Sequence, residues 1–262
     1  MNSFLALLFG LLAGSFLNVC IHRWPRGRSV VRPRSHCVRC RKMIAWYDNI
    51  PLLSYLLLGG RCRYCKRRIS PRYPLVEALT AGLFFYFVAT LGLTAAALKM
   101  CVFSAMLVAL IFSDLEKRIL PDQFTLGGLV IGLIFAAFVP VPDNTVAMLL
   151  WLLGVEPTGR LQSLAESAFA AVLLAGILWA GGAIYFKLRH RAGLGLGDVK
   201  LVAMMGAFLG LHLALEALVV GAIAGSIIGM AYILATHQKA STYELPFGAF
   251  LGAAGLAMAL AG

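Results

Sequence analysis

Long apolar runs divide this chain and constrain its fold more than any other feature. A helix needs about 20 apolar residues to cross the hydrocarbon core of a bilayer. Eight runs approach or reach that length, at roughly residues 3–21, 74–92, 95–113, 123–141, 165–186, 199–211, 213–236 and 245–261. Hydrophobic residues make up 61% of the chain and charged residues 13%, too few to cover a soluble domain. The sequence predicts an all-α polytopic membrane protein with about eight transmembrane helices.

The longest polar segment lies between the first two runs. This expectation divides the chain into a first transmembrane helix at 1–21, a polar insert at 22–73 and a transmembrane core at 74–262. The insert holds 14 of the 23 Lys and Arg residues and a single acid, Asp48. The positive-inside rule therefore places the insert in the cytosol. Such a basic juxtamembrane face is attracted to anionic lipid, which accounts for the net charge of +12. The lipid bilayer is therefore the expected partner of the basic residues, and no nucleic-acid partner is expected.

The insert contains two C-x2-C pairs. They are Cys37 with Cys40 and Cys62 with Cys65. Two such pairs can place four thiolates tetrahedrally around Zn²⁺, and four protein ligands leave no open position for a catalytic water. Disulfides are the weaker interpretation because the cytosol is reducing. An insert of this size with few aliphatic side chains buries too little apolar surface to be stable alone, so the zinc is expected to be structural.

Two aspartates lie at the ends of apolar runs. Asp114 ends the third run and Asp198, in Gly-Leu-Gly-Asp, precedes the sixth. Ionisable groups in such places are costly and often functional. Threading the runs alternately through the membrane brings both carboxylates to the cytosolic face, where a pair sharing one proton can activate water and hydrolyse a peptide bond. Helix dipoles favour the anion at Asp198 and the proton at Asp114. Asp122 is expected to be only a helix cap.

Several short motifs accompany these residues over nearly the whole chain. They are Gly14 to Val19 (GSFLNV) with Arg23 and Pro25, the two cysteine pairs, Tyr47 to Tyr55 (YDNIPLLSY), Arg72 to Glu77 (RYPLVE), Asp114 with Pro121-Asp122, Gly195 to Lys200 (GLGDVK) and Pro246-Phe247-Gly248. Jointly they resemble the type IV prepilin peptidases, the bifunctional leader peptidase and N-methyltransferase enzymes of bacterial pilus and type II secretion systems.

The resemblance implies an activity, substrates and a cofactor. It implies a GxGD-type aspartic intramembrane protease of the bacterial inner membrane that removes a basic leader from type IV prepilins and pseudopilins, with Asp114 and Asp198 as the catalytic pair. It also implies methylation of the new N-terminal residue with S-adenosylmethionine as donor. The family associates this second activity with the cysteine-rich insert and its flanks, where Glu77 is a candidate cofactor-binding residue. A charge at a helix start is the alternative role of Glu77.

Two other functions stay open at this point. One is a peptidase without methyl transfer, as in archaeal preflagellin relatives, which the resemblance describes as lacking such an insert. The other is a proton-coupled transporter, in which paired intramembrane aspartates relay protons. A transporter would need more polar residues near the middle of the membrane, whereas this chain keeps its acids near the ends of its apolar runs.

Overall fold

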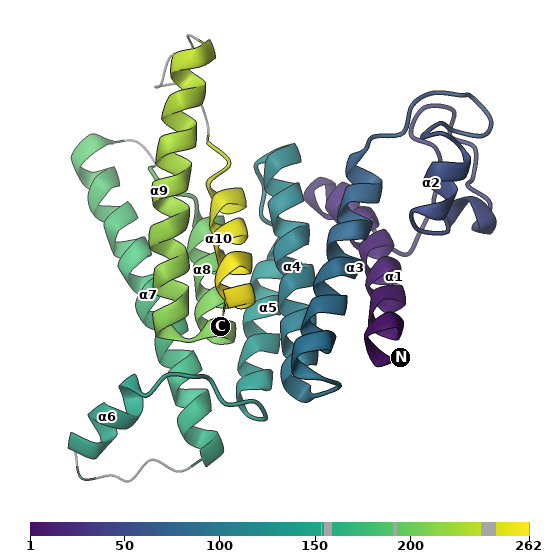
Figure 1. The fold of residues 1–262 in the computed structure, drawn as a ribbon. Helices are drawn as coiled ribbons and strands as arrows, with labels where there is room; N and C mark the ends of the chain where they lie inside the picture. The colour runs from purple at the N-terminus through teal and green to yellow at the C-terminus, as the bar shows by residue number, and fades with distance from the viewer. Residues whose placement is uncertain (153, 155–158, 191–192, 237–244, 262) are drawn as a thin grey trace. The chain divides into compact units, whose positions relative to one another are not determined.

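The long elements of secondary structure in the part of the chain that the structure describes are all helices, and two isolated β-bridges lie in the insert. The structure is a computed structural model that describes residues 1–152, 154, 159–190, 193–236 and 245–261. Its long helices are α1 (Asn2–Arg23), α3 (Arg72–Leu91), α4 (Ala95–Lys117), α5 (Asp122–Ala136), α7 (Gly159–Arg189), α8 (Leu196–Leu209), α9 (Leu211–Thr236) and α10 (Phe247–Ala261) (Figure 1). Shorter elements are η1 (Trp24–Arg26), η2 (Trp46–Asn49), α2 (Leu53–Leu57) and α6 (Thr145–Leu152).

All eight predicted apolar runs form helices, which confirms the predicted fold class. Five of them, α1, α3, α4, α7 and α9, are long and apolar enough to cross a membrane. Helices α5, α8 and α10 have 15, 14 and 15 residues. At 1.5 Å per residue they measure about 21–23 Å, less than the hydrocarbon core of about 30 Å. The protein is thus a multi-pass membrane protein, and its described residues form five helices that are long and apolar enough to span a membrane, together with the three shorter helices.

The chain forms two compact units, Met1–Ala109 and Leu110–Gly262, and α4 runs through the boundary. In the first unit α1 packs along α3 (Figure 1). Gly10 and Gly14 permit this approach, because a Cβ atom at Gly14 would lie 2.7 Å from Glu77 Cα and one at Gly10 would lie 2.6 Å from Ala81 Cα. Small residues at helix contacts are the usual means of close packing in membranes.

Replacing one of these glycines should separate the two helices. We expect Gly14→Ala to lower the free energy of unfolding of the purified protein by about 1–3 kcal/mol, the usual cost of overpacking. Gly82→Ala is the matched control, because no atom lies within 4 Å of a Cβ there and alanine is the better helix former. The unfolding of both variants can be followed in denaturant. Equal stability of the two variants would contradict the close-contact explanation.

Helix α8 is the centre of the second unit. Every residue from Leu201 to Leu209 is buried, and α5, α7, α9 and α10 pack around the helix. Glycines again mark close approaches: a Cβ at Gly206 would lie 2.9 Å from the backbone of Ala170, and one at Gly221 would lie 3.0 Å from Leu251 Cα. A helix enclosed in this way faces other helices along its buried length, so its shortness does not expose unpaired backbone groups there to lipid.

A single glycine separates α8 from α9, where the sequence predicts a division near Leu211. Gly210 has a left-handed φ of 84°, and Asp143 accepts hydrogen bonds from the backbone N–H groups of Leu211 and His212. Asp143 therefore caps the start of α9. It belongs to the segment between α5 and α7, which contains the eight-residue helix α6. Residues 153 and 155–158 of that segment lie outside the described residues.

Candidate active site and cysteine centre

The two predicted catalytic aspartates both lie in the second unit, one near the end of its helix and the other near the start of its helix. Asp114 lies in the last turn of α4 and is 6% exposed. Asp198 lies in the first turn of α8 and is partly buried. The two carboxyl groups are close enough to interact electrostatically. The structure thus brings together two residues that are far apart in the sequence, and the helix ends differ as the sequence predicts.

The start of α10 completes the surroundings of Asp114. Its Oδ2 atom accepts a hydrogen bond of 2.9 Å from the backbone N–H of Ala249. A Cβ atom at Gly248 would lie 3.3 Å from the same oxygen. The Pro246-Phe247-Gly248 motif therefore has a physical role, because it delivers a backbone donor to the carboxylate and passes close to it without a side chain at Gly248.

Leu120 links the surroundings of the two acids. Its side chain lies 2.8 Å from the position of a Cβ at Gly248 and 3.2 Å from that of a Cβ at Gly197. Gly195 lies beside the second acid, because a Cβ atom at Gly195 would lie 3.2 Å from Asp198 Oδ2. Both glycines of the GLGD segment thus border occupied space, Gly195 beside the acid and Gly197 beside Leu120.

Asp122 does not cap its helix, so that prediction is wrong. It is the first residue of α5, Pro121 occupies the cap position, and no side-chain hydrogen bond caps the helix. The Asp122 carboxylate instead accepts a hydrogen bond from Lys200 Nζ at 2.7 Å, and its side chain is 56% exposed. The GLGDVK segment therefore reaches α5 through its lysine.

The four cysteines of the insert form one cluster. Their Sγ atoms all lie within 4.8 Å of one another, and Cys37 Sγ lies 3.8 Å from Cys65 Sγ. Sulfur atoms at the corners of a tetrahedron with metal–sulfur bonds of about 2.3 Å would be about 3.8 Å apart. All four thiols are free rather than disulfide-bonded. The cluster can hold a metal ion.

The two C-x2-C turns have the same backbone geometry. In the first, the N–H of Arg41 donates to Cys37 O and the N–H of Cys37 donates to Lys42 O. In the second, the N–H of Lys66 donates to Cys62 O, and the N–H of Cys62 donates to Arg67 O. Arg41 and Lys66 share a left-handed conformation, with φ of 59° and 53°. Such paired turns are typical of structural zinc sites.

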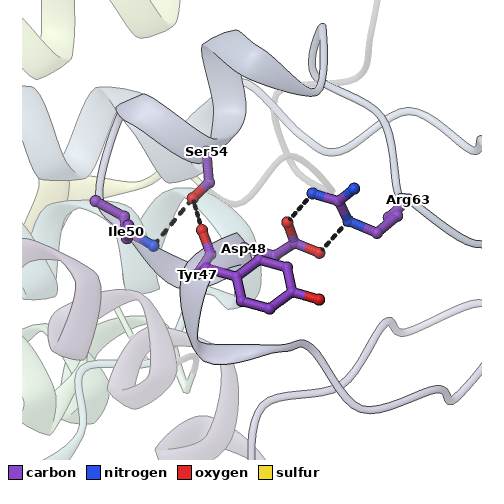
Figure 2. Close-up of polar contacts among 5 residues, drawn as sticks. All are labelled: Tyr47, Asp48, Ile50, Ser54 and Arg63. Carbon is purple, nitrogen blue, oxygen red and sulfur yellow. Dashed lines mark hydrogen bonds and ion pairs between the residues drawn. The ribbon is translucent and has the colours of Figure 1, made fainter.

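The YDNIPLLSY motif forms a turn that is attached to the second C-x2-C pair (Figure 2). Arg63 donates two hydrogen bonds to Asp48, from Nε at 2.7 Å and from an Nη at 2.6 Å. Ser54 donates to Tyr47 O at 2.9 Å and accepts from the N–H of Ile50 at 3.0 Å. The Arg63 guanidinium lowers the pKa of Asp48, so the ion pair persists until the pH falls through that lowered value.

Glu77 connects α3 to the insert. Its Oε2 atom accepts a hydrogen bond of 2.8 Å from the backbone N–H of Leu52, and Ser15 of α1 hydrogen-bonds the same carboxylate. Nearby, Asn18 Nδ2 donates to Tyr73 O at 2.9 Å. The GSFLNV and RYPLVE motifs therefore meet where the insert joins the two membrane helices.

Comparison with known proteins agrees with this arrangement. Residues 8–91 match the bacterial peptidase A24 N-terminal domain, and residues 101–234 match the type IV leader peptidase family. The second match contains both Asp114 and Asp198. The chain belongs to the type IV leader peptidase family. It is therefore an enzyme of the peptidase class.

Relatives of this leader peptidase family are similar along most of the chain. A protein of Myxococcus xanthus is 39% identical over 90% of this chain, which spans 65% of that protein. A protein of Aeromonas salmonicida is 36% identical over 96% of this chain, which spans 88% of that protein. A protein of Pseudomonas aeruginosa is 33% identical over 95% of this chain, which spans 87% of that protein. All three are named prepilin leader peptidase/N-methyltransferase. No solved structure matches the chain.

Sequence reasoning did not identify Leu120 or Ala249 as parts of the leader peptidase site. Leu120 is an ordinary aliphatic residue between two helices, and Ala249 acts only through its backbone N–H. The Pro246-Phe247-Gly248 motif was the only signal, because it immediately precedes Ala249.

Proposed function

We propose that this protein removes the leader from type IV prepilins and pseudopilins at the cytosolic face of the bacterial inner membrane and then methylates the new N-terminal amine. The observation that carries the peptidase half is the meeting of Asp114 and Asp198 in one unit of a chain of this family. The insert, with its 14 basic residues, faces the cytosol in this proposal.

Peptide hydrolysis needs a base and an acid, which the two aspartates supply. Asp198, near the positive end of the α8 dipole, is the carboxylate that takes a proton from the attacking water. Asp114, near the negative end of α4, carries the proton that passes to the oxygen of the scissile carbonyl. The N–H of Ala249 occupies Asp114 Oδ2, so Oδ1 is the oxygen left to hold that proton. A proton then moves to the leaving amine as the peptide bond breaks.

The backbone around the acids is as necessary as the acids themselves. A Cβ atom at Gly195 would lie 3.2 Å from Asp198 Oδ2, and one at Gly248 would lie 3.3 Å from Asp114 Oδ2. Glycine at both positions keeps side-chain atoms off the carboxylates that the water and the scissile carbonyl must reach. The apolar stem of the pilin would remain among the membrane helices while its leader stays in the cytosol, so specificity depends largely on the depth at which the peptide bond is presented.

The insert holds the metal and supports methyl transfer. Cys37, Cys40, Cys62 and Cys65 bind Zn²⁺ as a structural ion, since four thiolates complete a tetrahedral site. When bound, S-adenosylmethionine supplies a methyl group whose bond to sulfur breaks as the neutral N-terminal amine forms the new C–N bond and loses one proton. Glu77 serves this activity by holding Leu52 and Ser15 in place rather than by reacting.

Co-expression with a tagged prepilin tests the proposal. The wild-type protein and substrate are produced in a bacterial host that lacks its own prepilin peptidase, and the N-terminal residue and mass of the pilin are determined. We expect a pilin shortened by its leader and heavier by one methyl group. If the prepilin stays uncut, the peptidase function is rejected. Proton transport is then the remaining function, and proton flux across vesicles that contain the protein measures it. A cleaved but unmethylated pilin would leave a peptidase alone.

A further inference from the structure

A cleft of about 440 Å³ lies within the first unit, where the C-terminal half of α1 meets the insert. Three separate segments line it: residues 12–23 of α1, residues 30–35 and residues 44–51. Its volume lies within the range of about 300–1,000 Å³ that is usual for small-molecule sites. Neither the aspartates nor the cysteines belong to this cleft.

Two of the motifs that carry the family resemblance converge on the cleft. Ser15, Phe16 and Val19 of GSFLNV line one side, and Asn49 and Pro51 of YDNIPLLSY line another. Peptide hydrolysis by the aspartates does not use these residues, and the metal does not bind them. Their meeting in one place indicates a second site.

Buried polar contacts hold the walls of the cleft. Arg23, which is 8% exposed, donates hydrogen bonds to the carbonyl oxygens of Ser29 at 3.0 Å, Val30 at 3.2 Å and Pro33 at 2.7 Å. These bonds fix the loop that forms one wall. On the other wall, the Asp48 to Arg63 ion pair and the Ser54 hydrogen bonds fix the turn that carries Asn49 (Figure 2).

We propose that this cleft binds S-adenosylmethionine, an inference that rests on the proposed methyltransferase function. Trp46 lines the cleft and is 75% exposed, and its ring, which meets the Tyr47 ring edge to face, can stack on the adenine. Arg34 can pair with the carboxylate of the methionine moiety. Asn49 and Ser15 offer polar groups for the ribose and the adenine edge.

The apolar side of the cleft explains how the methyl acceptor reaches it. Leu12 and Phe16 line the cleft and are 60% and 54% exposed on the membrane-crossing helix α1. The trimmed pilin, whose apolar stem stays in the membrane, can therefore move along this face of α1 and present its amine to the donor. A site open to both lipid and cytosol suits an acceptor of this kind and a soluble donor.

Binding of S-adenosylhomocysteine, the demethylated product, tests the assignment without catalysis. The full-length protein in lipid nanodiscs is titrated by calorimetry. We expect the wild type to bind one S-adenosylhomocysteine per chain. Trp46→Ala should weaken this affinity by roughly tenfold or more, because the adenine loses its stacking partner. Arg34→Ala should weaken it by about tenfold through loss of a charged hydrogen bond. Trp151→Ala on α6, which is 71% exposed in the wild type, is the matched control and should bind normally.

Leader cleavage separates the possible outcomes. All three variants should cleave prepilin at the wild-type rate, which shows that they are folded. If the wild type methylates pilin while Trp46→Ala and Arg34→Ala bind S-adenosylhomocysteine normally, the donor site lies elsewhere and the placement is wrong. If the wild type neither binds the product nor methylates pilin, the methyltransferase function itself fails.

Discussion

Asp114→Asn and Asp198→Asn are each expected to slow leader cleavage by roughly 10²- to 10⁴-fold, the usual contribution of a general acid or base. An amide neither takes a proton from water nor donates the proton of a carboxylic acid. Asparagine keeps the size of the side chain, and its carbonyl oxygen can still accept the hydrogen bond from Ala249. The loss would therefore reflect chemistry rather than folding. Single-turnover cleavage of a purified prepilin in detergent or nanodiscs measures it.

Asp122→Asn is the control for this experiment. Asp122 is an acid of the same unit, but it is 56% exposed in an ion pair with Lys200. Such pairs contribute only about 0–1 kcal/mol, so cleavage should stay within about twofold of the wild-type rate. A near-normal rate in either Asp114→Asn or Asp198→Asn would remove that residue from the catalytic pair.

Replacing a cysteine of the cluster is expected to have the second large effect. Cys37→Ser should reduce bound zinc from one ion per chain to nearly none. Structural zinc contributes about 10–16 kcal/mol to the folding of small zinc peptides, far more than the packing of a small insert supplies. Residues 24–71 should then become sensitive to protease, and methylation of pilin should be lost. Metal analysis, limited proteolysis and pilin mass measure these three effects.

Cys101→Ala provides the matched control for the cysteine experiment. Cys101 is a buried free thiol in α4, outside the cluster. Its replacement should leave the zinc content and the protease resistance of the insert unchanged. Wild-type protein without stoichiometric metal, or Cys37→Ser with a normal zinc content, would contradict the proposed metal site. We expect Cys37→Ser to retain most leader cleavage, because the aspartates lie in the other unit.

Sequence alone predicts the helices and the cysteine cluster because both depend on local patterns. Apolar runs fix where helices form in a membrane, and even the break beside Leu211 is marked by the interruption of such a run. The spacing of Cys37, Cys40, Cys62 and Cys65 is that of a zinc site, and their sulfur atoms do converge. The prediction that Asp114 and Asp198 meet required only the direction in which each helix is threaded.

Features that depend on packing were not predictable. Helix α5 is shorter than its apolar run suggests, because hydropathy does not distinguish contact with lipid from contact with neighbouring helices. Asp122 was mistaken for a cap since Lys200, its partner, is distant in the sequence. The backbone donor at Ala249 has no side-chain signature. Similarly, no local pattern revealed that Ser15 and Asn49 line the same cleft.

The central claim is that Asp114 and Asp198 act as one catalytic pair, and the double variant tests it most directly. Residual single-turnover cleavage is measured for each single Asn variant and for Asp114→Asn combined with Asp198→Asn, all in the same nanodiscs. Residues that act as a unit have strongly non-additive effects. We therefore predict that the double variant cleaves prepilin about as slowly as the slower single variant. A double variant slowed by the product of the two single effects would contradict the paired mechanism.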